Sequence, residues 1–144
     1  MKNSILQKDN FGCSSACLAF ITNKTHEEVI NDLGKEKART KGFYCREIVN
    51  YLKKLGYKAE YHYLKPKWRK KIYQDKTIVF IKRGKKYLFG HYLVRYQNLW
   101  MDSWINFQKD KNIRKAKAGF RKRLPDTPIY GIFIKDETKE TRSD

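Results

Sequence analysis

The stretch LQKDNFGCSSACLAF, residues 6–20, joins a polar segment to a run of small and then apolar residues that contains two cysteines. The small residues around Cys13 and the apolar ones that follow predict a short buried helix that begins at or next to this cysteine. Unpaired N–H groups and the helix dipole stabilise a thiolate at such a position. Gln7 stands six positions earlier, where its side-chain amide could donate to an oxyanion beside the Cys13 N–H. The stretch therefore raises the hypothesis that Cys13 is a nucleophile.

The composition of the chain is that of one small globular domain. Of its 144 residues, 40% are hydrophobic and 15% aromatic, enough to bury a single core. We predict one domain over residues 1–135 and a disordered tail over residues 136–144, which has almost no apolar content. The chain has no apolar run of the roughly 18 residues that a membrane span needs and no signal peptide, so we expect a soluble, cytoplasmic protein. Three irregularly spaced cysteines indicate reduced thiols, and we expect no metal and no cofactor.

A strong excess of positive charge is the second feature of the sequence. The 33 Lys and Arg residues outnumber the 15 Asp and Glu residues, for a net charge of +18, and they concentrate in residues 65–71, 82–86 and 109–123. Such runs are usually solvated faces or hairpin turns, and the alternative is a surface for nucleic acid or an acidic partner. No specific nucleic-acid-binding motif accompanies them. The candidate surface comprises Lys65, Lys67, Arg69, Lys70, Lys71, Arg114, Lys115, Lys117, Arg121, Lys122 and Arg123.

Hydrophobic periodicity divides the chain into a helical part and a strand part. After the first helix, residues 25–34 predict a second one with Thr25 and Glu28 as a capping box, and residues 43–56 predict a third. Residues 105–123 are expected to form a helix or a long loop. Aromatic and β-branched residues predict strands at 57–64, 76–82, 87–96, 99–104 and 128–135. Three helices followed by a mostly antiparallel sheet make an α+β domain.

Two residues of the strand part could complete a cysteine-based site. Nucleophilic catalysis by cysteine requires an imidazole, a group that orients it and donors for the oxyanion. His91 lies in one predicted strand and Asp102 lies at the end of the next. A hairpin turn at residues 97 and 98 would place His91 opposite Ser103 or Trp104, next to Asp102. The two side chains are therefore expected in the same part of the sheet.

The other cysteines and histidines are predicted to have structural roles. Cys17 and Cys45 suit buried positions in helices. His26, expected on an exposed helix turn, and His62, in a strand, are not followed by an acid at hairpin distance. Asp102 is flanked by large apolar residues and needs a partner, which is either His91 or one of the many Lys and Arg side chains.

Three stretches, QKDNFGCSSACLAF, GHYLVRY and LWMDSW, resemble the papain-like cysteine peptidases. The likeness is strongest to the bacteriocin-processing peptidases, which remove double-glycine leader peptides, and it extends from about residue 5 to residue 134. It implies a papain-like α+β fold in which N-terminal helices, with the nucleophile at the start of the first, pack on a mostly antiparallel sheet. By this resemblance Gln7 is the oxyanion donor, Cys13 the nucleophile, His91 the base and Asp102 the acid that orients it.

The chain departs from the family pattern next to these residues. Gly12 and Ser14 flank the cysteine where the family has an acid and a glycine. Ser103 follows Asp102 where the family has a proline.

We therefore predict a cysteine peptidase that cleaves a peptide or protein substrate, for which a chain with a charge of +18 would favour acidic peptides or a polyanionic surface. One alternative is acyl transfer or deamidation by the same four groups. The other is a non-catalytic basic module of the same fold that binds nucleic acid or an acidic partner.

Overall fold

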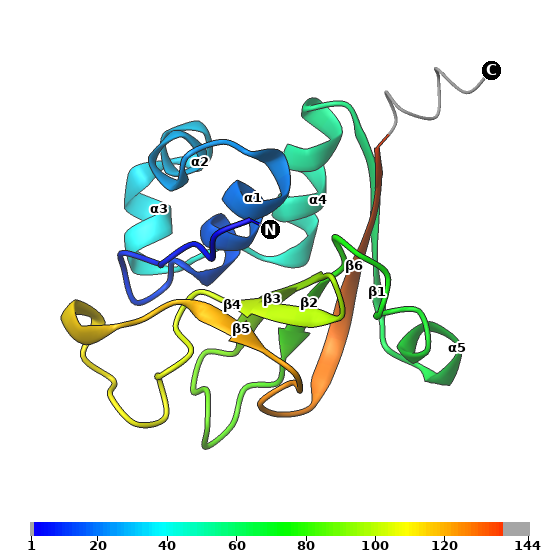
Figure 1. The fold of residues 1–144 in the computed structure, drawn as a ribbon. Helices are drawn as coiled ribbons and strands as arrows, with labels where there is room; N and C mark the ends of the chain where they lie inside the picture. The colour runs from blue at the N-terminus through cyan, green and yellow to red at the C-terminus, as the bar shows by residue number, and fades with distance from the viewer. Residues whose placement is uncertain (1, 137–144) are drawn as a thin grey trace.

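The computed structural model describes residues 2–136 as a helical layer packed on one sheet (Figure 1). The layer contains α1 (Cys13–Thr22), α2 (His26–Leu33), α3 (Lys35–Thr40) and α4 (Cys45–Lys54), while the short α5 (Pro66–Arg69) lies apart from it. Within this part of the chain, no helix has the length and apolar character needed to cross a membrane.

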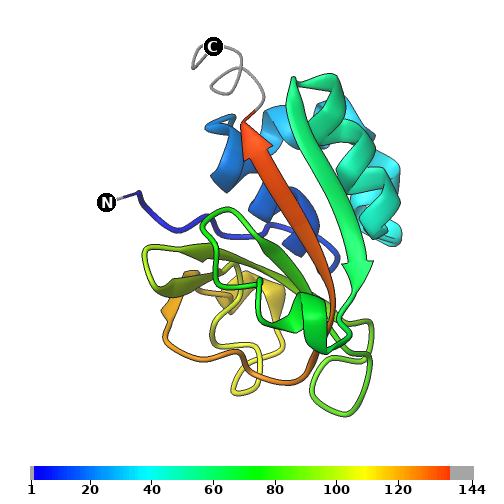
Figure 2. The same cartoon turned by 90° about the vertical axis from the view of Figure 1, so that its right-hand side faces the viewer.

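The sheet has six strands in the order β1-β6-β2-β3-β4-β5, and all neighbours are antiparallel. Figure 2 shows the long strands β1 and β6 side by side. The strands are β1 (Tyr57–Tyr63), β2 (Ile78–Ile81), β3 (His91–Tyr96), β4 (Leu99–Asp102), β5 (Gly119–Arg121) and β6 (Pro128–Asp136). The α+β class predicted from the sequence is confirmed.

Helix α1 is the centre of the fold, because every residue from Ser14 to Ile21 is buried. A helix that is apolar or small on all sides must be covered on all sides. One apolar cluster fills the space between the helices and the sheet, and a second covers the other face of the sheet. The first cluster includes Leu18, Ile48, Leu52, Val94 and Met101, and the second includes Leu64, Ile72, Val79, Leu93 and Trp100. The sheet therefore holds the β3-β4 hairpin rigidly against α1.

The predicted capping box and hairpin are both present. The Thr25 hydroxyl accepts a hydrogen bond from the Glu28 N–H, and the Glu28 carboxylate accepts one from the Thr25 N–H, each at 3.0 Å. Gln97 and Asn98 have φ values of 47° and 66°, as a tight hairpin turn requires. The pairs Tyr96 with Leu99 and Val94 with Met101 set a register that, continued, puts position 91 opposite position 104. This is the predicted alignment.

Several element boundaries differ from the prediction. Helix α3 and strand β5 were not predicted, because α3 buries only Ala38 and β5 has just three residues. The strand predicted from residue 87 begins only at His91, since Leu88 and Phe89 are exposed and Gly90 takes a φ of 77°. The backbone of β6 extends to Asp136, and the rest of the predicted tail lies outside the described residues.

Candidate active site

Cys13 is the first residue of α1 and lines a cavity of about 1080 Å³. The helical hydrogen-bond ladder begins only where the Ala16 N–H donates to the Gly12 carbonyl, so the N–H groups of residues 13–15 are not used by the helix. Gln7 and His91 line the same cavity. The residues predicted as nucleophile, oxyanion donor and base therefore line one cavity.

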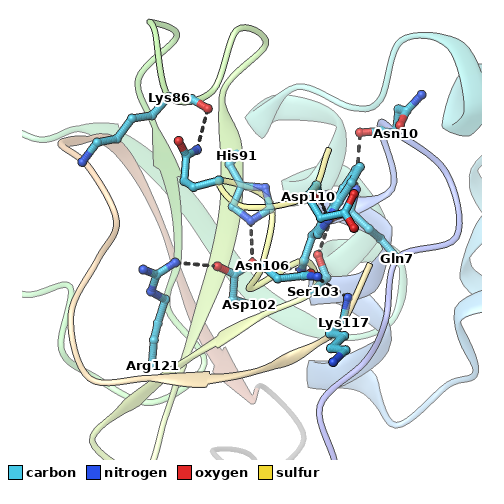
Figure 3. A network of polar contacts seen from close by, with 12 residues as sticks. Gln7, Asn10, Lys86, His91, Asp102, Ser103, Asn106, Asp110, Lys117 and Arg121 are labelled. Atoms are coloured by element: carbon cyan, nitrogen blue, oxygen red, sulfur yellow. Dashed lines mark hydrogen bonds and ion pairs between the residues drawn. The ribbon is translucent and has the colours of Figure 1, made fainter. Parts of the chain in front are cut away.

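His91 and Asp102 form a buried pair on the β3-β4 hairpin. The imidazole Nε2 and the carboxylate Oδ1 are 2.7 Å apart, and the two side chains are 5% and 0% exposed. Figure 3 shows Asp102 between His91 and Arg121, whose guanidinium donates to Oδ2 at 3.0 Å. The Trp104 N–H donates to Oδ1, also at 3.0 Å. Both partners considered from the sequence are thus present, because this carboxylate binds the histidine and an arginine.

The electrostatics of this pair favour a charged imidazole. Burial alone would lower the pKa of His91, but the charge and hydrogen bond of Asp102, with a contribution from the Cys13 side chain, raise it to about 10. For Asp102, burial would raise the pKa, but His91, the Trp104 N–H and Arg121 hold it below its ordinary value. Since Nε2 is bound to Asp102, Nδ1 is the ring nitrogen left for a thiol.

Gln7 is anchored to the residue that follows the catalytic acid candidate. Its backbone N–H donates to the Ser103 carbonyl at 3.2 Å, and its side-chain Oε1 accepts from the Ser103 hydroxyl at 2.6 Å (Figure 3). Its Nε2 donates to the carbonyls of Asp9 at 3.0 Å and Asn10 at 3.3 Å. The serine that replaces the family's proline therefore ties the segment before α1 to the β4 end.

Aromatic rings cover the histidine. Tyr87 stacks on His91 with ring centres 4.7 Å apart, and Phe107 stacks on the other side of Tyr87 at 5.3 Å. Trp104 meets Phe107 edge to face at 4.8 Å. This wall keeps water from the imidazole and strengthens its interaction with Asp102.

The sequence did not indicate three further residues of this site. Tyr87 stacks on His91, Ser103 binds Gln7, and Arg121 binds Asp102. Arg121 belongs to the candidate basic surface in the sequence analysis, but its side chain is directed to Asp102. Only the pairing of β4 with the short β5 brings it there, with Trp100 opposite Arg121 in the register. No sequence signal near Asp102 points to an arginine nineteen positions away.

Of the remaining cysteines and histidines, only Cys45 lines this cavity. Cys17 is fully buried, as predicted, and burial raises the pKa of its thiol well above the ordinary value. Cys45 lines the cavity, with its sulfur 3.7 Å from the Tyr92 hydroxyl. The prediction of an exposed His26 was wrong: it is 6% exposed, and its ring contacts the Ser15 hydroxyl at 2.7 Å. His62 stacks on Trp68 near α5.

The two halves of the candidate basic surface belong to opposite edges of the sheet. Residues 65–71 follow the edge strand β1, whereas residues 114–123 surround the other edge strand β5. Near α5, Lys67 and Lys71 lie over the Trp68 ring, and Arg69 donates to the Leu64 carbonyl. This arrangement does not support a single basic patch formed by both halves.

Comparison with solved structures identifies the fold. The chain is similar to the peptidase domain of Streptococcus ComA, a bi-functional ABC transporter involved in a quorum-sensing pathway, with a TM-score of 0.60 and 18% sequence identity. The match covers 93% of this chain and 98% of that one. The chain therefore has the fold of this peptidase domain. No protein-family model and no curated protein matches the sequence. The papain-like fold expected from the three sequence stretches is thus confirmed at the level of structure.

Proposed function

We propose that this protein is a cysteine peptidase that uses Cys13, His91, Asp102 and Gln7. The observation that carries the proposal is the buried His91–Asp102 pair, whose histidine lines the same cavity as a cysteine at a helix N-terminus. The likeness to a peptidase domain supports the same class of reaction.

The first half of the reaction transfers an acyl group to the enzyme. The Cys13 thiolate attacks the carbonyl carbon of the scissile amide, and the carbonyl oxygen takes up the negative charge. In this proposal the Cys13 N–H and the Gln7 Nε2 donate to the oxyanion, and Nε2 exchanges one of its bonds to the Asp9 and Asn10 carbonyls for the bond to the substrate. The protonated His91 then gives its proton to the leaving nitrogen, so that the C–N bond breaks and a thioester remains.

The second half returns the enzyme to its starting state. Neutral His91 takes a proton from water, the hydroxide attacks the thioester, and the acid product leaves as the Cys13 sulfur regains its negative charge. Asp102 holds the imidazole by Nε2 throughout, because its own position is held by the Trp104 N–H and by Arg121. Replacement of water by an amine acceptor would make the same site an acyl transferase.

The proposal predicts a thiol that is reactive in mild acid. We expect iodoacetamide to alkylate Cys13 faster than Cys45 at about pH 5 to 6, because the protonated His91 stabilises the attacking thiolate. In His91→Ala this reactivity should vanish, because the imidazolium that stabilises the thiolate is gone. Mass spectrometry of the labelled peptide, with Cys45 as the internal reference in each sample, measures both rates. An inert Cys13, or identical profiles in the two proteins, contradicts the proposal.

Gln7 provides a separate prediction for the oxyanion. We expect Gln7→Ala to lower kcat/KM by about 10²- to 10³-fold, the usual cost of one oxyanion donor. Ser103→Ala is the matched control, since it removes the side-chain anchor of Gln7 but leaves both the amide donor and the backbone bond at 3.2 Å. Its loss should be clearly smaller. Equal losses in the two variants would mean that Gln7 only links the segments.

A further inference from the structure

Over residues 2–136, the cavity that Cys13 lines has positively charged residues in its lining and no negatively charged ones. Its described lining residues include seven Lys and Arg side chains and no Asp or Glu. All seven are exposed. Four of them, Lys82, Arg83, Lys85 and Lys86, lie on the loop between β2 and β3 that leads directly into His91. More than half of the cations in the lining therefore come from the one loop that precedes the histidine.

The other three cations approach from different segments. Lys41 and Arg46 flank the residues that lead into α4, and Lys111 lies in the loop before β5. In the described chain, none of the seven forms an ion pair with a carboxylate. The acid that follows Arg46, Glu47, is paired with Lys37 instead. Charges of one sign in a hollow with low-dielectric walls focus the field on whatever enters it.

Apolar side chains share this lining. Tyr44, Leu88 and Phe89 are 66%, 70% and 62% exposed, although they belong to residue types that are normally covered. Among the described residues, Phe89 has one aromatic ring partner, Phe11, with ring centres 5.2 Å apart in an edge-to-face arrangement. Exposed apolar side chains that cluster at a cavity mark a surface for a ligand.

We propose that the substrate segment bound across this cavity is an acidic peptide with interspersed large apolar residues. This inference rests on the proposed peptidase function and specifies its substrate class. Carboxylates of the peptide meet the cations of residues 82–86, while its apolar side chains cover Leu88, Phe89 and Tyr44. A peptide fits better than a nucleic acid, because the charges surround groups arranged to attack a carbonyl and because Leu88 is an aliphatic side chain with no face on which a base could stack.

The test measures binding without catalysis. Cys13→Ala protein is titrated with two fluorescein-labelled peptides of equal length, one repeating Glu-Leu-Glu-Phe and the other Gln-Leu-Gln-Phe, and anisotropy is recorded. The glutamate peptide should bind about ten-fold more tightly at low salt. The difference should shrink as NaCl rises from about 0.05 to about 0.5 M, because the Debye length falls several-fold.

A matched pair of triple variants separates the cavity from the overall charge. Lys82→Gln, Arg83→Gln and Lys85→Gln together should remove most of the preference for glutamate. Lys35→Gln, Lys53→Gln and Lys54→Gln remove three positive charges from exposed positions that do not line the cavity, and should leave the preference for glutamate largely unchanged. Thermal unfolding of both triple variants checks that each is folded.

Three results would overturn the inference. These are equal binding of the two peptides, equal losses in the two triple variants, and tighter cavity-dependent binding of a labelled oligouridine than of the glutamate peptide. Failure of the peptidase proposal gives a different result: the glutamate preference persists in the binding assay, but wild-type protein cleaves no peptide of a proteome-derived library.

Discussion

Replacement of Cys13 by alanine is expected to abolish peptide cleavage, with a loss of about 10⁴- to 10⁶-fold in kcat/KM, and His91→Ala should come close to it. Without the sulfur no acyl-enzyme forms, and without the imidazole no group in contact with Cys13 protonates the leaving nitrogen. The two changes act on one unit, so the double variant should be no worse than the poorer single one. The measurement is the count of new N-termini that wild-type and variant proteins generate in a proteome-derived peptide library.

Each variant has a matched control within the same chain. Cys45→Ala removes another thiol from the cavity wall, and His62→Ala removes a histidine that stacks on Trp68 and does not line the cavity. Both should keep activity within about ten-fold of the wild type. Unchanged cleavage by Cys13→Ala, or a loss of equal size in Cys45→Ala, would rule out Cys13 as the nucleophile.

Asp102→Ala is expected to reduce both stability and activity. Asp102 is 0% exposed and holds His91, Arg121 and the Trp104 N–H, so its removal leaves two cationic groups without their counter-ion. Breaking a buried pair in this way costs about 3–5 kcal/mol of unfolding free energy. Loss of the group that orients the base should lower kcat/KM by about 10²- to 10⁴-fold.

The stability loss should depend on pH in a defined direction. The pKa of His91 is about 10 in the folded protein and 6.5 in an unfolded chain, so the proton stabilises the fold fully below pH 6.5 and progressively less as pH rises toward 10. The pKa of Asp102 is lowered, so its contribution is present above the ordinary value of 3.8 and is lost as pH falls below it. In Asp102→Ala, burial still lowers the pKa of His91 and the Cys13 side chain still raises it, so without the carboxylate this pKa should lie well below 10. The stability difference between wild type and variant is therefore largest near pH 4 to 6.5 and narrows up to about pH 10.

Urea unfolding at pH 5, 7 and 9, followed by circular dichroism, measures this difference. Arg121→Gln is the discriminating control, because it removes the other partner of Asp102 and leaves the bond to His91 intact. Its side chain is 28% exposed, and we expect a cost of about 1 kcal/mol and little change in the pH dependence. If Arg121→Gln lowered the free energy of unfolding as much as Asp102→Ala does, the Asp102 carboxylate would serve mainly as the partner of the arginine.

The candidate site was largely predictable because its members lie in strong local patterns. Cys13 follows a turn and begins a helix of small residues, and His91 and Asp102 flank a two-residue hairpin whose turn sequence sets the register. Residues linked by one helix start or one hairpin are placed by short-range geometry. Gln7 was identified by spacing alone, and its bond to Ser103, which is 96 positions away, has no local signal.

The predictions that were wrong concern residues whose surroundings depend on contacts between segments far apart in the chain. His26 was expected to be exposed because its capping box is polar, but the packing of α2 on α1 places its ring against the Ser15 hydroxyl. Arg121 was grouped with a basic stretch, but the short β5 pairs with β4 and turns it toward Asp102. Residues 82–86 were expected to form a solvated hairpin turn and residues 87–90 to begin the next strand, but β2 ends at Ile81 and β3 begins only at His91, so the whole segment forms a loop that lines the cavity.

By itself, the sequence determined the α+β class, the start of α1 at Cys13 and the hairpin register, because each depends on periodicity, capping or turn chemistry within a few residues. The roles of the four candidate catalytic residues came from the resemblance to papain-like cysteine peptidases. Only the tertiary structure decided which partners Asp102 and Gln7 have, that His26 is buried, and that the basic segments do not form one patch. Those features depend on contacts between segments far apart in the chain, whose geometry is set by the packing of the whole core.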